Sequence, residues 1–234
     1  MYIWYVLGVL TFFSVLLACW AQIKVSTNYS KYSKVFINSE LTASMYAKRM
    51  LSIAGIDDVK VVKTHGTMTD YYNHRKKVLA LSTGVFDNNS VASFGIMAHE
   101  VGHAIQYKDG YLPIKIRNFL IPVANACSWL VWPLLIIGVL LDAFMFMGGY
   151  SQYVIMGALV LVVVPVLINL VTLPVEINAS KRAVTILQES GYLDATHLDG
   201  AKKVLSAAAL TYLASFILSL INMLRFILIF VRRD

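Results

Sequence analysis

Long uncharged apolar stretches alternate with polar segments along this chain of 234 residues. A helix needs about 20 apolar residues to cross a bilayer, and four stretches are long enough. They cover residues 2–23, 119–141, 153–173 and 201–231. Arg225 interrupts the last stretch, which therefore either spans with Arg225 near one interface or lies partly in that interface. The pattern predicts an α-helical multispan membrane protein with about four spans.

The segment between the first two stretches has the pattern of a small α+β domain. Apolar residues at helical spacing predict a helix over residues 39–54. Short strands are predicted at 59–62 and 77–82, with a polar, turn-rich segment between them. A second helix is expected to follow a cap among residues 88–90 and to end near Asp109. The strand just before this helix could bind an extended substrate at the sheet edge.

The second helix of this domain contains the H-E-x-x-H motif His99-Glu100-Val101-Gly102-His103. Residues four apart lie on one helix face, so both imidazoles can bind one tetrahedral Zn²⁺ ion. Glu100 can then act as general base on a zinc-bound water. Two stray histidines on an amphipathic helix are the alternative, which the apolar flanks disfavour. Gly102 is expected to leave room beside the metal.

Composition agrees with a membrane protein. Hydrophobic residues make up 58% of the chain and charged residues 14%, and the mean hydropathy is +0.67. The net charge of +7 comes without a basic-aromatic recognition motif, so we expect no nucleic-acid partner. Neither Cys19 nor Cys127 has metal-ligand spacing. No basic residue precedes the first stretch, which favours a retained span over a signal peptide or a lipoprotein cleavage box.

The positions of the basic residues predict the topology. Lys and Arg are absent from Asn118 through Ser180 and dense on both sides of that segment. The positive-inside rule places both flanks in the cytoplasm and the turn at 142–152 outside. The second and third stretches then form a hairpin that returns the chain to the face of the membrane that holds the H-E-x-x-H helix.

A catalytic zinc usually has three protein ligands and one open position. None of the other histidines extends the motif, so a downstream carboxylate is expected as the third ligand. The candidates are Asp142, Glu176, Glu189, Asp194 and Asp199. Glu176 is preferred because it lies just beyond the third stretch, after Pro174, where a new helix could start. Asp142 lies a membrane thickness away, whereas Glu189, Asp194 and Asp199 remain possible because they lie on the correct side.

Several segments resemble the neutral zinc metallopeptidases of bacterial membranes, often called YugP-like. They are residues 69–70 with 75–79, 98–106, 173–183 and 198–205. The pattern Glu176-x-x-Ala179-Ser180 also resembles the E-x-x-A-D of HtpX-like membrane peptidases, whose Glu is the third zinc ligand. Ser180 stands where those enzymes have Asp, so we expect a hydroxyl hydrogen bond there in place of a carboxylate.

The resemblance implies a zinc-dependent endopeptidase of the bacterial cell membrane with a zincin-like, gluzincin-type domain. It implies one Zn²⁺ held by His99, His103 and Glu176, with Glu100 as general base, acting on protein or peptide substrates. The active site is expected on the cytoplasmic side of the bilayer, and no oligomeric state is predicted. The implied parts are a first span at 1–23, a peptidase domain at 24–118, a hairpin at 119–173, a third-ligand helix at 174–203 and a C-terminal apolar helix at 204–234.

Other assignments follow less directly. Arg182 and Tyr192 are nominal oxyanion stabilisers, although Arg182 is equally explained as the basic flank of a span. A catalytically silent zinc-binding scaffold or quality-control adaptor is one rival function, and the intact Glu100 argues against it. A transporter or channel is another rival. The spans of a transporter should carry buried ionisable residues. The second and third stretches contain no Asp, Glu, Lys, Arg or His, only the amides Asn125 and Asn169.

Overall fold

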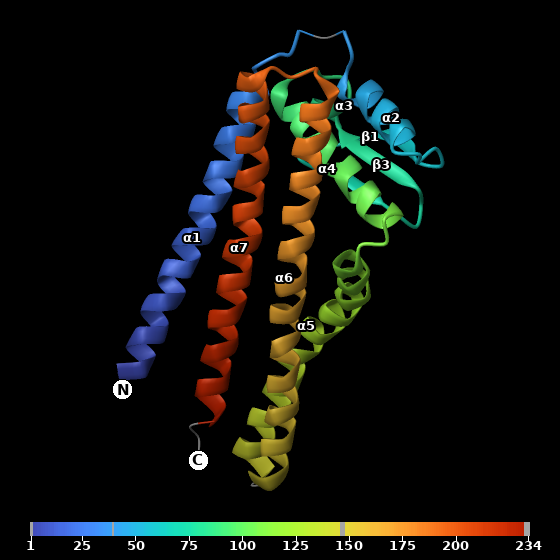
Figure 1. Cartoon of the computed structure of the whole chain (residues 1–234). Helices are drawn as coiled ribbons and strands as arrows, with labels where there is room; N and C mark the ends of the chain where they lie inside the picture. The colour runs from blue at the N-terminus through green and yellow to red at the C-terminus, as the bar shows by residue number, and fades with distance from the viewer. Residues whose placement is uncertain (1, 39, 146–147, 232–234) are drawn as a thin grey trace. The chain divides into compact units, whose positions relative to one another are not determined.

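The structure is a computed structural model that describes residues 2–38, 40–145 and 148–231 (Figure 1). Its elements are α1 Tyr2–Tyr32, α2 Ala43–Ile53, β1 Lys60–Thr64, β2 Tyr71–Asn73, β3 Val78–Ser82, α3 Thr83–Phe86, α4 Val91–Lys108, α5 Leu112–Met145, α6 Gly148–Ser190 and α7 Ala195–Val231. They form two compact units. The helical unit contains Met1–Cys19, Lys115–Leu173 and Tyr212–Asp234, and the sheet unit contains Trp20–Ile114 and Pro174–Thr211.

The helical unit is built from parts of four helices that are long and apolar enough to cross a membrane. These candidate spans are Tyr5–Tyr32, Leu112–Leu141, Val160–Ser190 and Ala195–Leu228. Val131 and Leu135 of α5 are buried against Leu161 and Val162 of α6 and against Phe226 of α7. The sequence-based expectation of about four spans agrees with these lengths and compositions.

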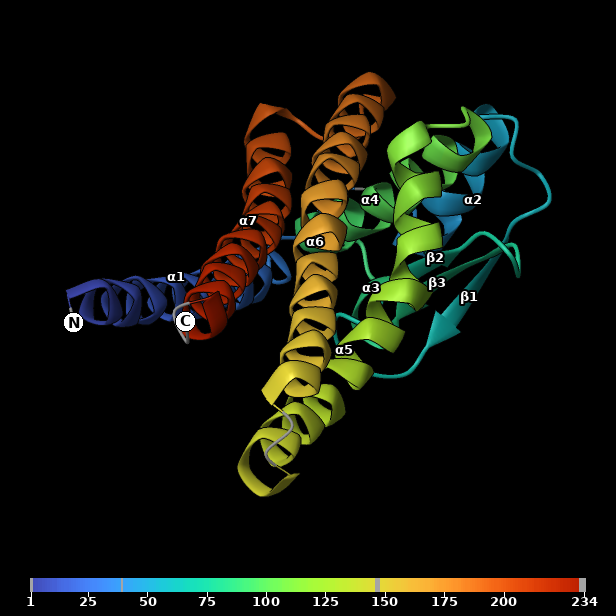
Figure 2. The ribbon, with the colours of Figure 1, turned by 90° about the horizontal axis from the view of Figure 1, so that it is seen from below.

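The sheet unit contains a three-stranded sheet in the order β1-β3-β2 (Figure 2). The central strand β3 pairs in parallel with β1 and antiparallel with β2. The main-chain N–H of Ser82, at the end of β3, donates to Asp70 Oδ1 at 2.7 Å, and the Ser82 Oγ lies 3.1 Å from Asp70 Oδ2. Asp70 therefore fixes the open end of the β2–β3 hairpin.

Two expectations about this sheet were wrong. β2 lies in the segment predicted to be only turn, because three residues are too few to show a strand pattern. The strand before the H-E-x-x-H helix is β3, which has a partner on both sides. The free edges of the described sheet belong to β1 and β2 instead.

Helix α4 begins and ends where the sequence predicts. Ser90 is its N-cap, and the Ser90 side chain accepts a hydrogen bond from the Ser93 N–H at 3.2 Å. The helix ends at Lys108, and Gly110 follows with a positive φ of 66°. Phe94 and Met97 are fully buried in the core of the sheet unit, so one face of α4 is anchored while another is free to carry polar groups.

Helix α6 crosses α4 within the sheet unit at very short range. A Cβ atom built on Gly102 would lie 2.7 Å from the main-chain oxygen of Ala179. Only a residue without a side chain allows the two backbones to approach this closely. Gly102 was expected to leave room beside the metal. In the structure, the α6 backbone occupies that room.

The helix boundaries differ from the sequence-based expectation in several places, of which three bear on the site or the domain limits. α6 is continuous from Gly148 to Ser190, so no new helix starts at Pro174. Proline is tolerated inside such helices where neighbouring groups satisfy the freed backbone. α1 continues past residue 23 to Tyr32. α2 begins at Ala43 with Thr42 as its cap, whereas residue 39, the expected start, lies outside the described part of the chain.

Candidate metal centre

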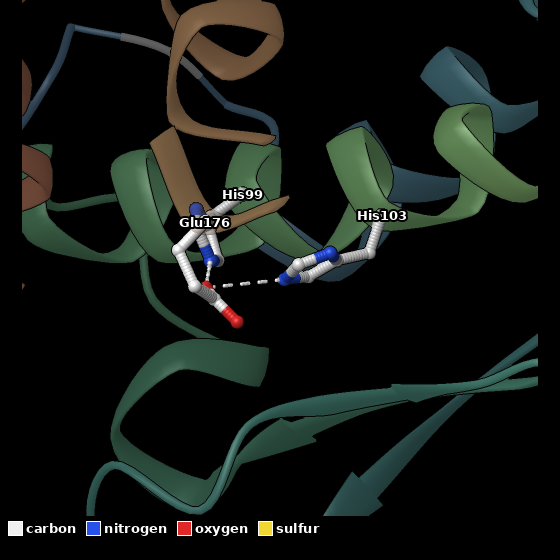
Figure 3. A group of neighbouring side chains, drawn as sticks. All are labelled: His99, His103 and Glu176. Carbon is white, nitrogen blue, oxygen red and sulfur yellow. Dashed lines mark hydrogen bonds and ion pairs between the residues drawn. The ribbon is translucent and has the colours of Figure 1, made fainter. Parts of the chain in front are cut away.

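Three side chains from two helices meet on the polar face of α4. His99 and His103 come from α4 and Glu176 comes from α6 (Figure 3). Glu176 Oε2 lies 3.1 Å from His99 Nε2 and 3.5 Å from His103 Nε2. One ligand atom from each residue lies within 4.8 Å of the others. The structure therefore brings together the three residues that the sequence nominated as ligands.

The spacing of these atoms fits a small tetrahedral cation. Two ligand atoms that are each about 2.0–2.1 Å from a tetrahedral Zn²⁺ lie roughly 3.3 Å from one another. The observed separations of 3.1 and 3.5 Å bracket that value. Two imidazole nitrogens and one carboxylate oxygen are also a donor set that catalytic zinc sites use. The residues present therefore fit a zinc ion.

The second nitrogen of each imidazole has its own partner. Ser180 Oγ lies 3.2 Å from His99 Nδ1, and Gln106 Oε1 lies 2.9 Å from His103 Nδ1. These contacts hold both rings with Nε2 directed at Glu176. The hydroxyl hydrogen bond expected from Ser180 is present in the structure.

Glu100 adjoins the three grouped residues without belonging to the group. Its side chain is buried, with 8% of the residue exposed. Burial raises the pKa of the Glu100 carboxyl, and the nearby His103 and His99 lower it by a smaller amount. Burial lowers the pKa of His103, but the hydrogen bond to Glu176 and the charge of Glu100 outweigh this and raise it overall. The site thus gathers two imidazoles and two carboxyl groups around the point where a cation would bind.

The two nominal oxyanion stabilisers are engaged elsewhere in the sheet unit. Arg182 donates to Asn178 Oδ1 at 2.9 Å and to Asp109 Oδ2 at 2.5 Å. Tyr192 Oη accepts a hydrogen bond from Arg49 at 2.6 Å. These contacts give no support to an oxyanion role for either residue.

Three other candidate third ligands do not join the group in the part of the chain that the structure describes. Asp194 pairs with His197 at 3.0 Å, and Asp199 pairs with Lys203 at 2.6 Å. Glu189 is not among the residues that gather with His99 and His103 in the described chain. The side chain of Asp142 lies outside the described residues. Glu176 is therefore the carboxylate that the fold brings to the two histidines.

Sequence reasoning missed two polar residues of this site, Gln106 and Asn178. Gln106 is completely buried, and its amide donates to Asn178 Oδ1 at 2.9 Å. The available signal was the spacing, because Gln106 follows His103 by three positions and so lies on the same face of α4.

Comparison with known proteins gives a consistent picture. Residues 7–231 match the family described as "Putative neutral zinc metallopeptidase". "Putative membrane protease YugP" of Bacillus subtilis (strain 168) is 40% identical over 214 residues, which is 92% of this chain and 92% of that protein. No solved structure matches the chain.

Proposed function

The chain belongs to the neutral zinc metallopeptidase family, and from this premise we propose that it is a membrane-embedded zinc endopeptidase with a zincin-like, gluzincin-type site. Its substrates would be membrane-associated or unfolded proteins. The observation that carries the proposal is the convergence of His99, His103 and Glu176, whose ligand atoms lie within 4.8 Å of one another. Glu100, which follows His99 in the sequence and lies outside the ligand group, would serve as the base.

The proposed mechanism assigns each side chain one role. His99, His103 and Glu176 would hold one Zn²⁺. The ion, when bound, supplies a Lewis acid that acidifies water and polarises a carbonyl group. Glu100 accepts a proton from the attacking water while the hydroxyl oxygen adds to the scissile carbonyl carbon. Glu100 then returns that proton to the leaving amine as the C–N bond breaks.

We place an extended substrate along the free edge of β2. Asp70 lies immediately before β2, and its charge raises the pKa of Glu100, although burial, the two histidines and Glu176 matter more. The Tyr72 ring of β2 lies 5.6 Å from the Tyr107 ring of α4. β2 thus lies beside α4, the helix that carries His99 and His103. The outer edge of β2 has no strand partner in the described sheet. An added strand would gain main-chain hydrogen bonds there.

The proposed location is a bacterial cell membrane, with the site on the cytoplasmic side. The support is the distribution of basic residues, because Lys and Arg are absent from Asn118 through Ser180 and dense on both sides of that segment.

Glu100→Gln tests the proposal because it removes the base and keeps the shape of the side chain. We expect the variant to retain one zinc per chain and to lose hydrolysis of an unfolded protein substrate, measured on the full chain in detergent micelles. A wild-type protein that holds zinc but cleaves nothing would instead identify a silent scaffold. Near-normal turnover by Glu100→Gln would refute the assignment of the base.

A further inference from the structure

Gln106 contacts both helices that supply the proposed ligands. It lies on α4 with no exposed surface, one turn after His103. Its Oε1 lies 2.9 Å from His103 Nδ1. Its Nε2 lies 2.8 Å from the main-chain oxygen of Val175 and 2.9 Å from Asn178 Oδ1, both on α6. One buried amide therefore connects a ligand of α4 with the α6 backbone beside Glu176.

The partners of this amide determine which way it points. A main-chain carbonyl can only accept a hydrogen bond, so the NH₂ group of Gln106 must face Val175. The amide oxygen must then face His103, and it can only accept. His103 Nδ1 must therefore carry the hydrogen and donate it. The lone pair of His103 consequently lies on Nε2, the atom that is directed at Glu176.

A second chain of contacts fixes the far side of the amide. Arg182 has only donors, so its 2.9 Å contact defines the Asn178 Oδ1 atom as an acceptor. The same oxygen accepts from Gln106. Arg182 also pairs with Asp109 at the end of α4. The hydrogen bonds thus run from α4 to α6 and back to α4.

We propose that Gln106 is the positioning residue of the metal centre. It holds His103 with Nε2 free for the metal and ties α6 in place at Val175, the residue before the third ligand. A carboxylate could receive the hydrogen of His103 but would repel the oxygens of Val175 and Asn178, so this position calls for an amide. The inference rests on the proposed zinc site, and the experiment separates the two.

Gln106→Met removes the hydrogen bonds and keeps a side chain of similar length. Loss of a partner that orients a metal ligand typically weakens metal binding by about 10–100-fold. We expect a zinc dissociation constant at least about ten-fold higher than that of the wild type, measured by chelator competition on the full chain in detergent.

Asn178 offers a matched pair of variants at a partly exposed position, where folding is less at risk. Asn178→Asp keeps an oxygen that accepts from both Gln106 and Arg182, so zinc affinity should stay within about two-fold of the wild type. Asn178→Leu removes that acceptor, and the loss of its two partly buried hydrogen bonds, from Gln106 and Arg182, should weaken zinc binding by about three-fold to ten-fold.

Nitrogen NMR of histidine-labelled, zinc-loaded protein supplies a readout that packing alone would not change. The wild type and Asn178→Asp should show a slowly exchanging Nδ1–H on His103, assigned through correlations to its own backbone. Gln106→Met should lose that signal to exchange with water.

Each outcome decides the inference. Wild-type zinc affinity in Gln106→Met, or an unchanged His103 Nδ1–H signal, would overturn the role of Gln106 and leave the proposed function intact. A wild-type chain that binds no zinc would overturn both. If Gln106→Met does not fold, the Asn178 pair decides: weaker binding by the Leu variant supports the inference, and equal binding by the two variants refutes it.

Discussion

Gly102→Ala is the substitution whose effect the structure specifies most directly. The added Cβ would lie 2.7 Å from the main-chain oxygen of Ala179, whereas ordinary contact begins at 3.4 Å. The neighbours are backbone atoms of α6, so no side chain can rotate out of the way. To remove this clash, α4 and α6 must separate locally by about 0.7 Å, which is the difference between the two distances.

A separation of this size is large for a metal site. Zinc–ligand distances vary by only about 0.2 Å, and Glu176 lies less than one turn from Ala179 on the same helix. We expect Gly102→Ala to weaken zinc binding at least about ten-fold and to lower turnover about 100-fold, the cost typical of misplacing a reacting group by about 1 Å.

Gly95→Ala is the matched control. It lies in the same helix, but its added Cβ would meet Ala201 Cβ at 3.6 Å, an ordinary contact. Both substitutions raise the helix propensity of α4 by about 1 kcal/mol, so that contribution cancels in the comparison. Zinc affinity by chelator competition and hydrolysis of an unfolded substrate should both separate the two variants. A Gly102→Ala protein with the zinc affinity and turnover of Gly95→Ala would refute the argument from the helix crossing.

The remaining predictions concern the metal, one carboxyl group and the topology. A chelator should abolish hydrolysis and added Zn²⁺ should restore it; activity that survives complete metal removal would contradict the zinc centre. Glu176→Ala should weaken zinc binding by more than ten-fold while the membrane level of the protein stays unchanged; tight zinc binding with full activity would exclude Glu176 as a ligand. Burial raises the pKa of Asp70, so its stabilising contribution is present below about pH 4 and is lost as pH rises through the folded-state pKa. The melting temperature of metal-free Asp70→Asn should therefore rise relative to that of the wild type as the pH increases from about 4 to about 7. A difference in melting temperature that falls over this range would contradict the argument. Ser151→Cys, in a chain whose Cys19 and Cys127 are replaced by Ser, should react with an impermeant thiol reagent only from outside the cell; labelling from the cytoplasmic side alone would reverse the topology.

Local rules predicted the parts of the molecule whose causes are local. The start of α4 follows from the Ser90 cap, and its end follows from Gly110 with its positive φ. The H-E-x-x-H spacing alone placed His99 and His103 on one face of that helix. Four apolar stretches were recognisable because crossing a bilayer requires a fixed length.

The same rules failed where a longer-range interaction outweighs the local preference. A proline after an apolar stretch suggests a helix start, yet α6 continues through Pro174. β2 is too short for a pattern, and the strand exists because it pairs with β3. Glu176 could be nominated because the membrane hairpin limits which carboxylates return to the same face, but its distance from His103 could not be predicted.

His103 is flanked on α4 by two residues that bind no metal and yet act on α6. Gly102 allows the α6 backbone to approach at Ala179, and Gln106 holds that backbone at Val175. The carboxylate of Glu176 lies on α6 between these two contacts, so its position depends on both of them. The sequence element that assembles the proposed centre is thus longer than H-E-x-x-H, since the motif supplies two of the proposed ligands and residues 102 and 106 determine where the third can lie. A side chain at position 102, or an apolar residue at position 106, would require another way to bring the Glu176 carboxylate to the two histidines.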